Sequence, residues 1–260
     1  MNLSLFLNKL KIREGDKIVI TSDILKLLIK SRAKKIKFDP NEFIDIIKKK
    51  IGKQGTLLIP TFNWDFFKGK IFYSNKTLSQ SGALGNIALR RKDFSRTFNP
   101  VYSFAVTGKD KKKLCSQRHI NCFSLNSPFG YLIKNKGKNL FVDLHQRVSD
   151  ETKLNGFPFH HVVEQAVGVP YRFIKEFNGY LVNNKKKKEK ILIKFYARNL
   201  KFKYNVYISK KLDKALLNKK ILDRKKIQGI NFDLLKLKPT FNILKDDLRT
   251  YGRFFVKKNL

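Results

Sequence analysis

A histidine and a glutamate three residues apart, His161 and Glu164, are the clearest candidates for chemistry in this chain. On a helix, residues at this spacing share a face. A carboxylate beside an imidazole fixes the tautomer of the ring and stabilises its protonated form, as a general base requires. An ordinary salt pair on a helix surface is the alternative interpretation. His160 would point about 100° away, and His119 and His145 have no partner at an informative spacing.

A second candidate is the small polar segment Thr21, Ser22 and Asp23. It follows the apolar run 18–20, which predicts a buried strand, and it precedes a helical pattern that begins at Ile24. Free backbone N–H groups and the helix dipole make such a junction an anion site. Ser and Asp are also ordinary helix caps, so a purely structural role stays open.

Other kinds of site have weaker support. Cys115 and Cys122 lack Cys-x-x-Cys spacing and no His-Glu-x-x-His occurs, so we expect no metal. Gly-x-Ser-x-Gly and the Gly-x-x-x-x-Gly-Lys phosphate loop are absent as well. Arg90, Arg91 and Arg96 follow a Ser- and Gly-rich turn and could hold a phosphate, or they could form a solvated helix end.

A β-α-β unit is predicted to position the polar segment. Its parts are the strand at 18–20, a helix from Pro40 to Ile51, and a second strand at 56–59. Such a unit implies parallel strands with a right-handed crossover. Both strands run into polar or aromatic residues, as expected at the carboxyl edge of an α/β sheet, where ligands bind.

The rest of the pattern predicts an α/β fold: a single domain over residues 1–260, with a mostly parallel or mixed sheet flanked by helices and an antiparallel extension near the C-terminus. The further elements are a helix at 84–89, strands at 101–106 and 140–143, a helix at 160–167 ended by Gly168, a charged loop at 185–188, and paired strands at 191–198 and 202–208. The last fifty residues give no clear assignment.

Composition bounds the class of protein. The chain has 260 residues, with 57 Lys and Arg against 20 Asp and Glu, for a net charge of +37. Its apolar content, 42%, is enough for a core and excludes general disorder. Lys, Ile, Asn and Phe are all abundant, which is typical of an AT-rich coding bias, so the charge alone does not predict nucleic-acid binding. We expect a cytoplasmic protein without a membrane span, since no long uncharged apolar run and no signal-like start occur.

These segments resemble the aminoglycoside 3-N-acetyltransferase family, in order, over about residues 10–180, with 185–260 as an extension of the same domain. The matching blocks are Gly15-Asp16-Lys-Ile-Val-Ile-Thr21-Ser22-Asp23, Ile51-Gly52-x-x-Gly55-Thr56-Leu-Leu-Ile-Pro60-Thr61-Phe62-x-Trp64, Thr77-x-Ser79-x-x-Gly82-Ala83-Leu84, Arg96-Thr97-x-x-Pro100-x-x-Ser103-Phe104-Ala105-x-x-Gly108, Ser127-Pro128-Phe129-Gly130, His161-x-x-Glu164 and Val169-Pro170-Tyr171-Arg172. The segments around Pro60 and Phe157 are most similar to the branch found among surface-polysaccharide genes.

The resemblance implies an enzyme that takes acetyl-CoA and acetylates an amine on an amino sugar, as in antibiotic resistance or polysaccharide biosynthesis. His161 would be the catalytic histidine and Glu164 its carboxylate. The segment Thr21, Ser22 and Asp23 would hold the pantetheine and thioester, and backbone N–H groups after Ser22 would stabilise the oxyanion.

The resemblance further implies that Gly82, Arg96 and Ser103 border the groove for CoA. The chain departs from many relatives at Pro158, where they have Thr, and at the Thr21 turn, where they have His-Ser-Ser. These departures leave open a catalytically inactive relative that only binds CoA or glycan. The net charge of +37 leaves open a basic nucleic-acid-binding protein. The sequence does not name the acceptor, exclude another acyl donor, or indicate the oligomeric state.

Overall fold

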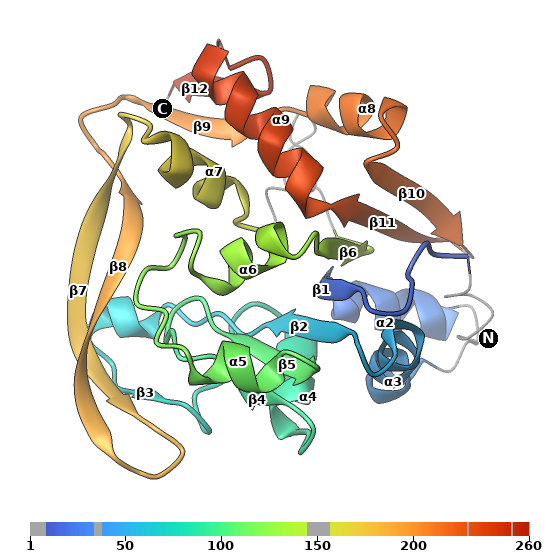
Figure 1. Ribbon diagram of the computed structural model, residues 1–260, viewed down its shortest axis with the longest axis horizontal. Helices are drawn as coiled ribbons and strands as arrows, with labels where there is room; N and C mark the ends of the chain where they lie inside the picture. Colours follow the sequence, from blue (N-terminus) through green and yellow to red (C-terminus); the bar gives the residue numbers. More distant parts are fainter. Residues whose placement is uncertain (1–8, 34–37, 145–156, 228, 251, 260) are drawn as a thin grey trace.

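A seven-stranded mixed sheet forms the centre of the molecule in the computed structural model, which describes residues 9–33, 38–144, 157–227, 229–250 and 252–259 (Figure 1). The strands run in the order β10-β11-β6-β1-β2-β5-β4. They are β1 (Lys17–Ser22), β2 (Thr56–Pro60), β4 (Ser95–Arg96), β5 (Phe104–Gly108), β6 (Lys138–Val142), β10 (Leu222–Ile227) and β11 (Ile230–Lys236).

The three central strands are parallel, and those outside them are antiparallel. β1 pairs with β2 and with β6 in parallel, so that Ile18 lies opposite both Leu57 and Lys138. The predicted β-α-β unit is therefore confirmed. β5 and β11 add to the two sides in antiparallel orientation, and β10 extends the sheet beyond β11 as an antiparallel hairpin that the sequence did not predict.

Helices cover both faces of this sheet. They are α2 (Ile24–Ala33), α3 (Pro40–Ile51), α4 (Ala83–Arg90), α5 (Lys111–Ser116), α6 (Pro128–Lys134), α7 (His160–Val167), α8 (Lys211–Asn218) and α9 (Leu237–Thr250), with a 3₁₀ turn η1 at Asp65–Lys68. Successive strand residues point to opposite faces. Ile18 and Ile20 accordingly join the core beneath α2, α3 and α4, whereas Val19 joins the second core, which includes residues of α6, α7 and α9.

Local signals fix the helix ends as the sequence predicts. Asp39 caps α3, its side chain accepting a hydrogen bond from the Asn41 N–H at 2.8 Å, with Pro40 in the first turn. Gly168 ends α7 in the left-handed conformation, with φ of 77°.

The predicted pairing of 191–198 with 202–208 is wrong. The first of these segments lies in β8 (Lys188–Arg198), which pairs over its whole length with β7 (Arg172–Val182) through the turn at 183–187. β9 (Tyr204–Ile208) pairs instead with β12 (Phe255–Asn259). β7 is mostly exposed, so it lacks the alternation of apolar and polar residues that marks a half-buried strand.

One strand boundary and one additional strand also differ from expectation. The strand predicted at 101–106 begins only at Phe104, because the N–H groups of Val101 and Tyr102 both donate to Asn99 Oδ1 at 2.9 Å and so hold the preceding residues in a turn. The two-residue strand β3 (Phe72–Tyr73), which extends the β7–β8 hairpin, was not predicted. Within the described residues, no helix has the length and apolar content needed to span a bilayer.

Candidate active site

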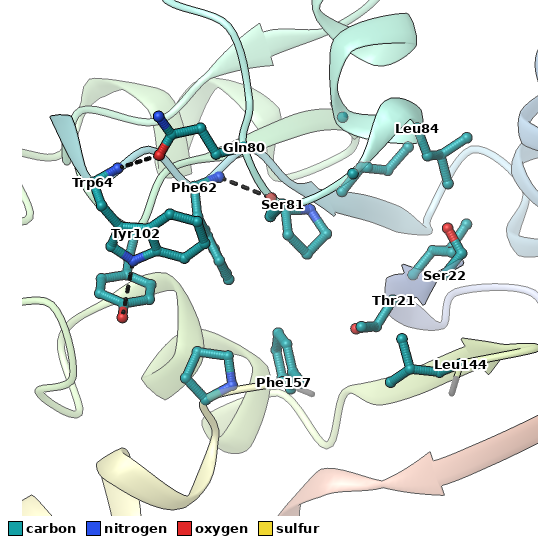
Figure 2. A pocket seen from close by; sticks show the side chains of 16 residues that line it. Thr21, Ser22, Phe62, Trp64, Gln80, Ser81, Leu84, Tyr102, Leu144 and Phe157 are labelled. Carbon is teal, nitrogen blue, oxygen red and sulfur yellow. Dashed lines mark hydrogen bonds between the residues drawn. The ribbon is translucent and has the colours of Figure 1, made fainter. Parts of the chain in front are cut away.

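A cavity of about 390 Å³ opens at the carboxyl ends of β1 and β2 (Figure 2). The side chains of Phe62, Trp64 and Tyr102 lie on one side of it and those of Thr21 and Ser22 on the other. The other lining residues come from the ends of β1 and β2, the start of α4 and the segments around 144 and 157: Ile20, Ile59, Pro60, Gln80, Ser81, Gly82, Leu84, Gly85, Leu144, Phe157 and Pro158. This is the sheet edge at which the sequence predicts a ligand.

Two of the predicted cofactor segments face each other across this cavity. Ser22 lines it, and Thr21 is held beside it by a hydrogen bond from its hydroxyl to Asn139 Oδ1 at 3.2 Å. Gly82 precedes α4 with φ of 119°, and a Cβ placed there would lie 3.8 Å from the Ser22 carbonyl oxygen. Because no side chain caps α4, its first turn offers backbone N–H groups beside Ser22.

Hydrogen bonds fix the loop between β2 and α4 against the cavity (Figure 2). The Phe62 N–H donates to Ser81 Oγ at 3.0 Å, and the Trp64 N–H donates to Gln80 Oε1 at 2.9 Å. Ser79 Oγ is 3.0 Å from Ser81 Oγ. Gln80 and Ser81 were not predicted as site residues. Their place between Ser79 and Gly82 in a matched block was the available signal.

Asp23 does not line the cavity. Its backbone N–H donates to the Val142 carbonyl at 3.1 Å, and its own carbonyl accepts from the Leu27 N–H at 3.2 Å. The Asp23 N–H is therefore already bonded within the sheet and is not available to an oxyanion. Of the backbone N–H groups that were expected to stabilise the oxyanion after Ser22, the one at Asp23 is therefore already used.

Arg96 and Ser103 do not line the cavity either, because their side chains are bonded behind it. Arg96 Nε donates to Ser103 Oγ at 2.9 Å, and the guanidinium also donates to the Thr61 carbonyl at 2.7 Å and to the Thr77 carbonyl. The Ser103 hydroxyl donates to the same Thr61 carbonyl at 2.9 Å. Burial without a carboxylate lowers the pKa of Arg96 to about 9. Arg96 thus fixes the chain directly after β2, rather than facing the cavity. Of its neighbours, Arg91 pairs with Asp45 and Asp93.

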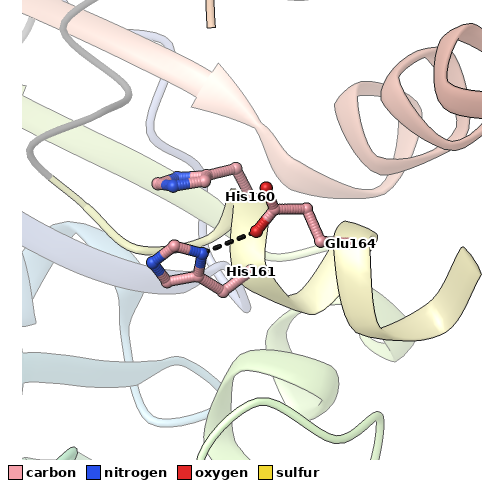
Figure 3. Close-up of side chains that lie close together, drawn as sticks. All are labelled: His160, His161 and Glu164. Carbon is pink, nitrogen blue, oxygen red and sulfur yellow. Dashed lines mark hydrogen bonds and ion pairs between the residues drawn. The ribbon is translucent and has the colours of Figure 1, made fainter. Parts of the chain in front are cut away.

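The predicted pair of His161 and Glu164 is formed on α7 (Figure 3). His161 Nδ1 lies 2.7 Å from Glu164 Oε2, and the Glu164 side chain is completely buried. The alternative of a salt pair on a helix surface is therefore wrong. Arg172 Nε lies 2.7 Å from Glu164 Oε2, and the Tyr171 hydroxyl donates to Glu164 Oε1 at 3.2 Å. Tyr171 and Arg172 were matched in sequence without a role, and the structure gives them one.

This environment keeps the imidazole neutral. Burial lowers the pKa of His161 well below the usual 6.5, and the Arg172 guanidinium lowers it further. Burial raises the pKa of Glu164, while His160, Arg172 and Tyr171 oppose the shift. When Glu164 is ionised it can only accept a hydrogen bond, so Nδ1 carries the proton and Nε2 keeps its lone pair. In Figure 3, His161 Nε2 lies on the side of the ring that faces away from Glu164.

The imidazole is connected to the cavity through two aromatic rings. The rings of His161 and Phe123 are 5.0 Å apart, edge to face, and those of Phe123 and Tyr102 are 4.7 Å apart. Tyr102 and Pro158 both line the cavity, and the His161 N–H donates to the Pro158 carbonyl at 3.2 Å. His161 itself is not a lining residue, and 16% of its side chain is exposed. The end of β1 therefore lines the cavity, and His161 lies directly behind residues that line the same cavity.

A metal centre could be drawn from the same residues, since ligand atoms of His160, His161 and Glu164 lie within 4.8 Å of one another. Against it, the Arg172 guanidinium already contacts the Glu164 carboxylate and would repel a cation. We assign no metal here. His145 lies outside the described residues.

A buried carboxylate that orients a neutral imidazole beside a cavity at the sheet edge is suited to an enzyme that moves a proton. The family model described as aminoglycoside 3-N-acetyltransferase matches residues 30–249. The chain therefore belongs to the aminoglycoside 3-N-acetyltransferase family. It is accordingly an acyltransferase.

Solved structures of similar fold agree with this membership. A structure of AAC-IIIb with CoASH has a TM-score of 0.74 and 15% identity, covering 97% of this chain and 96% of that one. Aminoglycoside acetyltransferase AAC(3)-Xa has a TM-score of 0.73 and 14% identity, covering 94% and 90%. YokD from Bacillus subtilis has a TM-score of 0.69 and 16% identity, covering 94% and 96%. No curated protein matches the chain by sequence.

The position of Arg96 behind the cavity gives a first test. Arg96→Gln should lower the free energy of unfolding by about 2 to 4 kcal/mol, because several charged hydrogen bonds to buried oxygens are lost. Denaturant unfolding measures this change. Arg90→Gln, at an exposed helix end, is the control and should change it by less than about 0.5 kcal/mol. A stable R96Q protein with only a raised KM for acetyl-CoA would instead show that Arg96 binds the cofactor.

Proposed function

We propose that this enzyme transfers the acetyl group of acetyl-CoA to an amine of an amino sugar, with His161 as general base. The observation that carries the proposal is the hydrogen bond between His161 and the buried Glu164, next to a cavity formed by the ends of β1 and β2. Family membership supplies the class of reaction. The site supplies the residues that would carry it out.

The proton transfer follows from this arrangement. A sugar ammonium must lose a proton before its nitrogen can attack a thioester. His161 Nε2 accepts that proton, directly or through a water molecule, and Glu164 stabilises the imidazolium that forms. The new C–N bond replaces the C–S bond of acetyl-CoA, and CoA leaves as the thiol once it has taken up a proton. General base catalysis of this kind contributes about 10²- to 10⁴-fold.

The thioester would lie in the cavity beside Ser22 and Gly82. The carbonyl oxygen becomes negative in the tetrahedral intermediate and needs donors already in position. Since the Asp23 N–H is bonded to Val142, we assign this role to the first turn of α4, which begins at Ala83. The backbone at residue 82 has φ of 119°, a conformation that side-chain-bearing residues rarely adopt, which explains a glycine there.

Charge favours an acceptor with few positive groups. Among the described lining residues of the cavity, none is an Asp or Glu, and the whole chain carries +37. A polycationic aminoglycoside would be repelled by this surface, while a sugar with one amine, or one attached to an anionic carrier, would not. We therefore propose that the natural acceptor is a sugar with one amine or an amino sugar attached to an anionic carrier. The cytoplasmic location stays a prediction.

The base can be tested directly. His161→Ala should lower kcat/KM by about 10²- to 10⁴-fold, because the amine then loses its proton to water alone. Release of free CoA measures the rate, and calorimetric binding of CoA checks that the variant is folded. His119→Ala, at a histidine outside this cluster, is the control. Activity of H161A within about tenfold of wild type would remove His161 from the role of base.

The pH profile tests the cause of the lowered pKa. The base works only when deprotonated, so the acidic limb of kcat/KM should lie below pH 6.5 in the wild type. Arg172→Gln removes the nearby cation, raises the pKa of His161 and should move this limb to higher pH. Arg172→Lys keeps the charge and should leave the limb nearly in place. An unmoved limb in R172Q would contradict the assignment.

An acceptor screen tests the substrate class. Mass spectrometry after incubation with acetyl-CoA should detect an added acetyl group on a neutral mono-amino sugar or on a nucleoside diphosphate amino sugar. Polycationic aminoglycosides should react at least about tenfold more slowly at low salt, with the difference shrinking as salt screens the repulsion. Preferential acetylation of the polycations at low salt would overturn this part of the proposal, and CoA binding without any turnover would favour the inactive alternative.

A further inference from the structure

A second cavity, of about 940 Å³, lies at the opposite edge of the sheet. It is formed by residues of the segments 11–16, 136–138, 217–224 and 234–242. These segments include the residues before β1 and the start of β6, whereas the candidate active site lies after those strands. Asp16 lines the second cavity and Ile20 the first, and these residues are four positions, or about 13 Å, apart along the chain entering β1. The second cavity is therefore a different site.

Its lining is unusually basic even for this chain. Eight of its 16 lining residues are Lys or Arg, compared with 57 of 260 in the sequence. Composition alone would place only about half as many cations there. Two lining residues, Asp16 and Asp223, are acidic.

Some of these cations have carboxylate partners. Lys138 Nζ lies 2.6 Å from Asp16 Oδ2, and Lys11 Nζ lies 3.9 Å from Asp223 Oδ1. Arg224 is paired with Asp213 and Asp233. These pairs account for both acidic lining residues.

Five cations of the cavity form no ion pair within the described part of the chain: Arg13, Lys136, Lys220, Lys236 and Lys238. All five are exposed, so each can point its charge into the hollow. Like charges that gather on a concave surface focus a positive potential there, and the potential favours a small multivalent anion.

Backbone conformation gives independent support. Lys136 and Lys220 have φ of 53° and 54°, and they are two of the four non-glycine residues with positive φ among those described. Each lies just after the end of a helix, α6 or α8, where glycine is the residue that fits without strain. Lysine is thus present at two positions where folding favours glycine, and both face the same cavity.

We propose that this basic cavity binds a small oligophosphate, either inorganic or as the diphosphate or triphosphate part of a nucleotide. Phosphate oxygens would accept from the ammonium groups of Lys136, Lys220, Lys236 and Lys238 and from the Arg13 guanidinium. The apolar side chains of Leu217 and Ile221 line the same hollow and leave room for an organic group. The site is independent of the acetyl-transfer reaction.

Glycine substitutions separate binding from folding. In Lys136→Gly and Lys220→Gly, the lost charge should weaken binding of inorganic tripolyphosphate, while relief of backbone strain should leave the melting temperature unchanged or higher. Calorimetry near physiological salt should show at least about a tenfold weaker affinity in the K136G/K220G double variant. Its KM for acetyl-CoA should not change, which distinguishes this cavity from the cofactor site.

Lys186→Gly is the matched control, since Lys186 also has positive φ, at 61°, but lies in the turn between β7 and β8. It removes the same charge and the same strain outside the cavity. ADP, titrated in parallel, distinguishes a nucleotide from an inorganic source, and tight binding of either supports the proposal. Three results would overturn the proposal. The first is that K186G weakens tripolyphosphate binding as much as K136G or K220G alone. The others are that tripolyphosphate does not bind near physiological salt, or that only duplex RNA binds tightly.

Discussion

The buried carboxylate of Glu164 is the group around which the site is organised. Removing a charged group from water costs free energy unless other groups compensate the charge. Here His161, Arg172 and the Tyr171 hydroxyl all contact the Glu164 carboxylate. These partners come from the helix that carries the base and from the start of β7. Tyr196 on β8 bonds to the Glu164 carbonyl at 3.4 Å. The same network therefore holds the base in position and attaches the long hairpin to the body of the protein.

A second, half-buried charge shows a different way to meet the same constraint. Arg96 has no carboxylate, and backbone carbonyls and the Ser103 hydroxyl satisfy it instead. Its guanidinium also lies over the ring of Phe72, 4.6 Å from the centroid. Carbonyls from both sides of the loop thus converge on one cation. The chain after β2, which carries the aromatic wall of the active cavity, is fixed by this convergence.

Sequence alone predicted what depends on local signals. The run 18–20, the helix that begins at Pro40 and the spacing of His161 and Glu164 each carry their information within a few residues, and the structure confirms the strand, the helix and the contact between the two side chains. Pairing partners depend on distant residues, so the alternation at 202–208 could not show that β12 is its partner. Burial is equally non-local. An arginine near a turn looks solvated in sequence, and only the packed loop shows Arg96 enclosed.

The open side of β7 has a consequence for handling the protein. Its described pairing on the side away from β8 is limited to Leu181 and Val182, and Phe173 and Ile174 are exposed along it. A bare strand of this kind is a template for another chain. The many lysines keep copies apart through mutual repulsion, which dissolved ions weaken. Concentrated salt, which usually helps to keep a basic protein in solution, will here favour edge-to-edge aggregation.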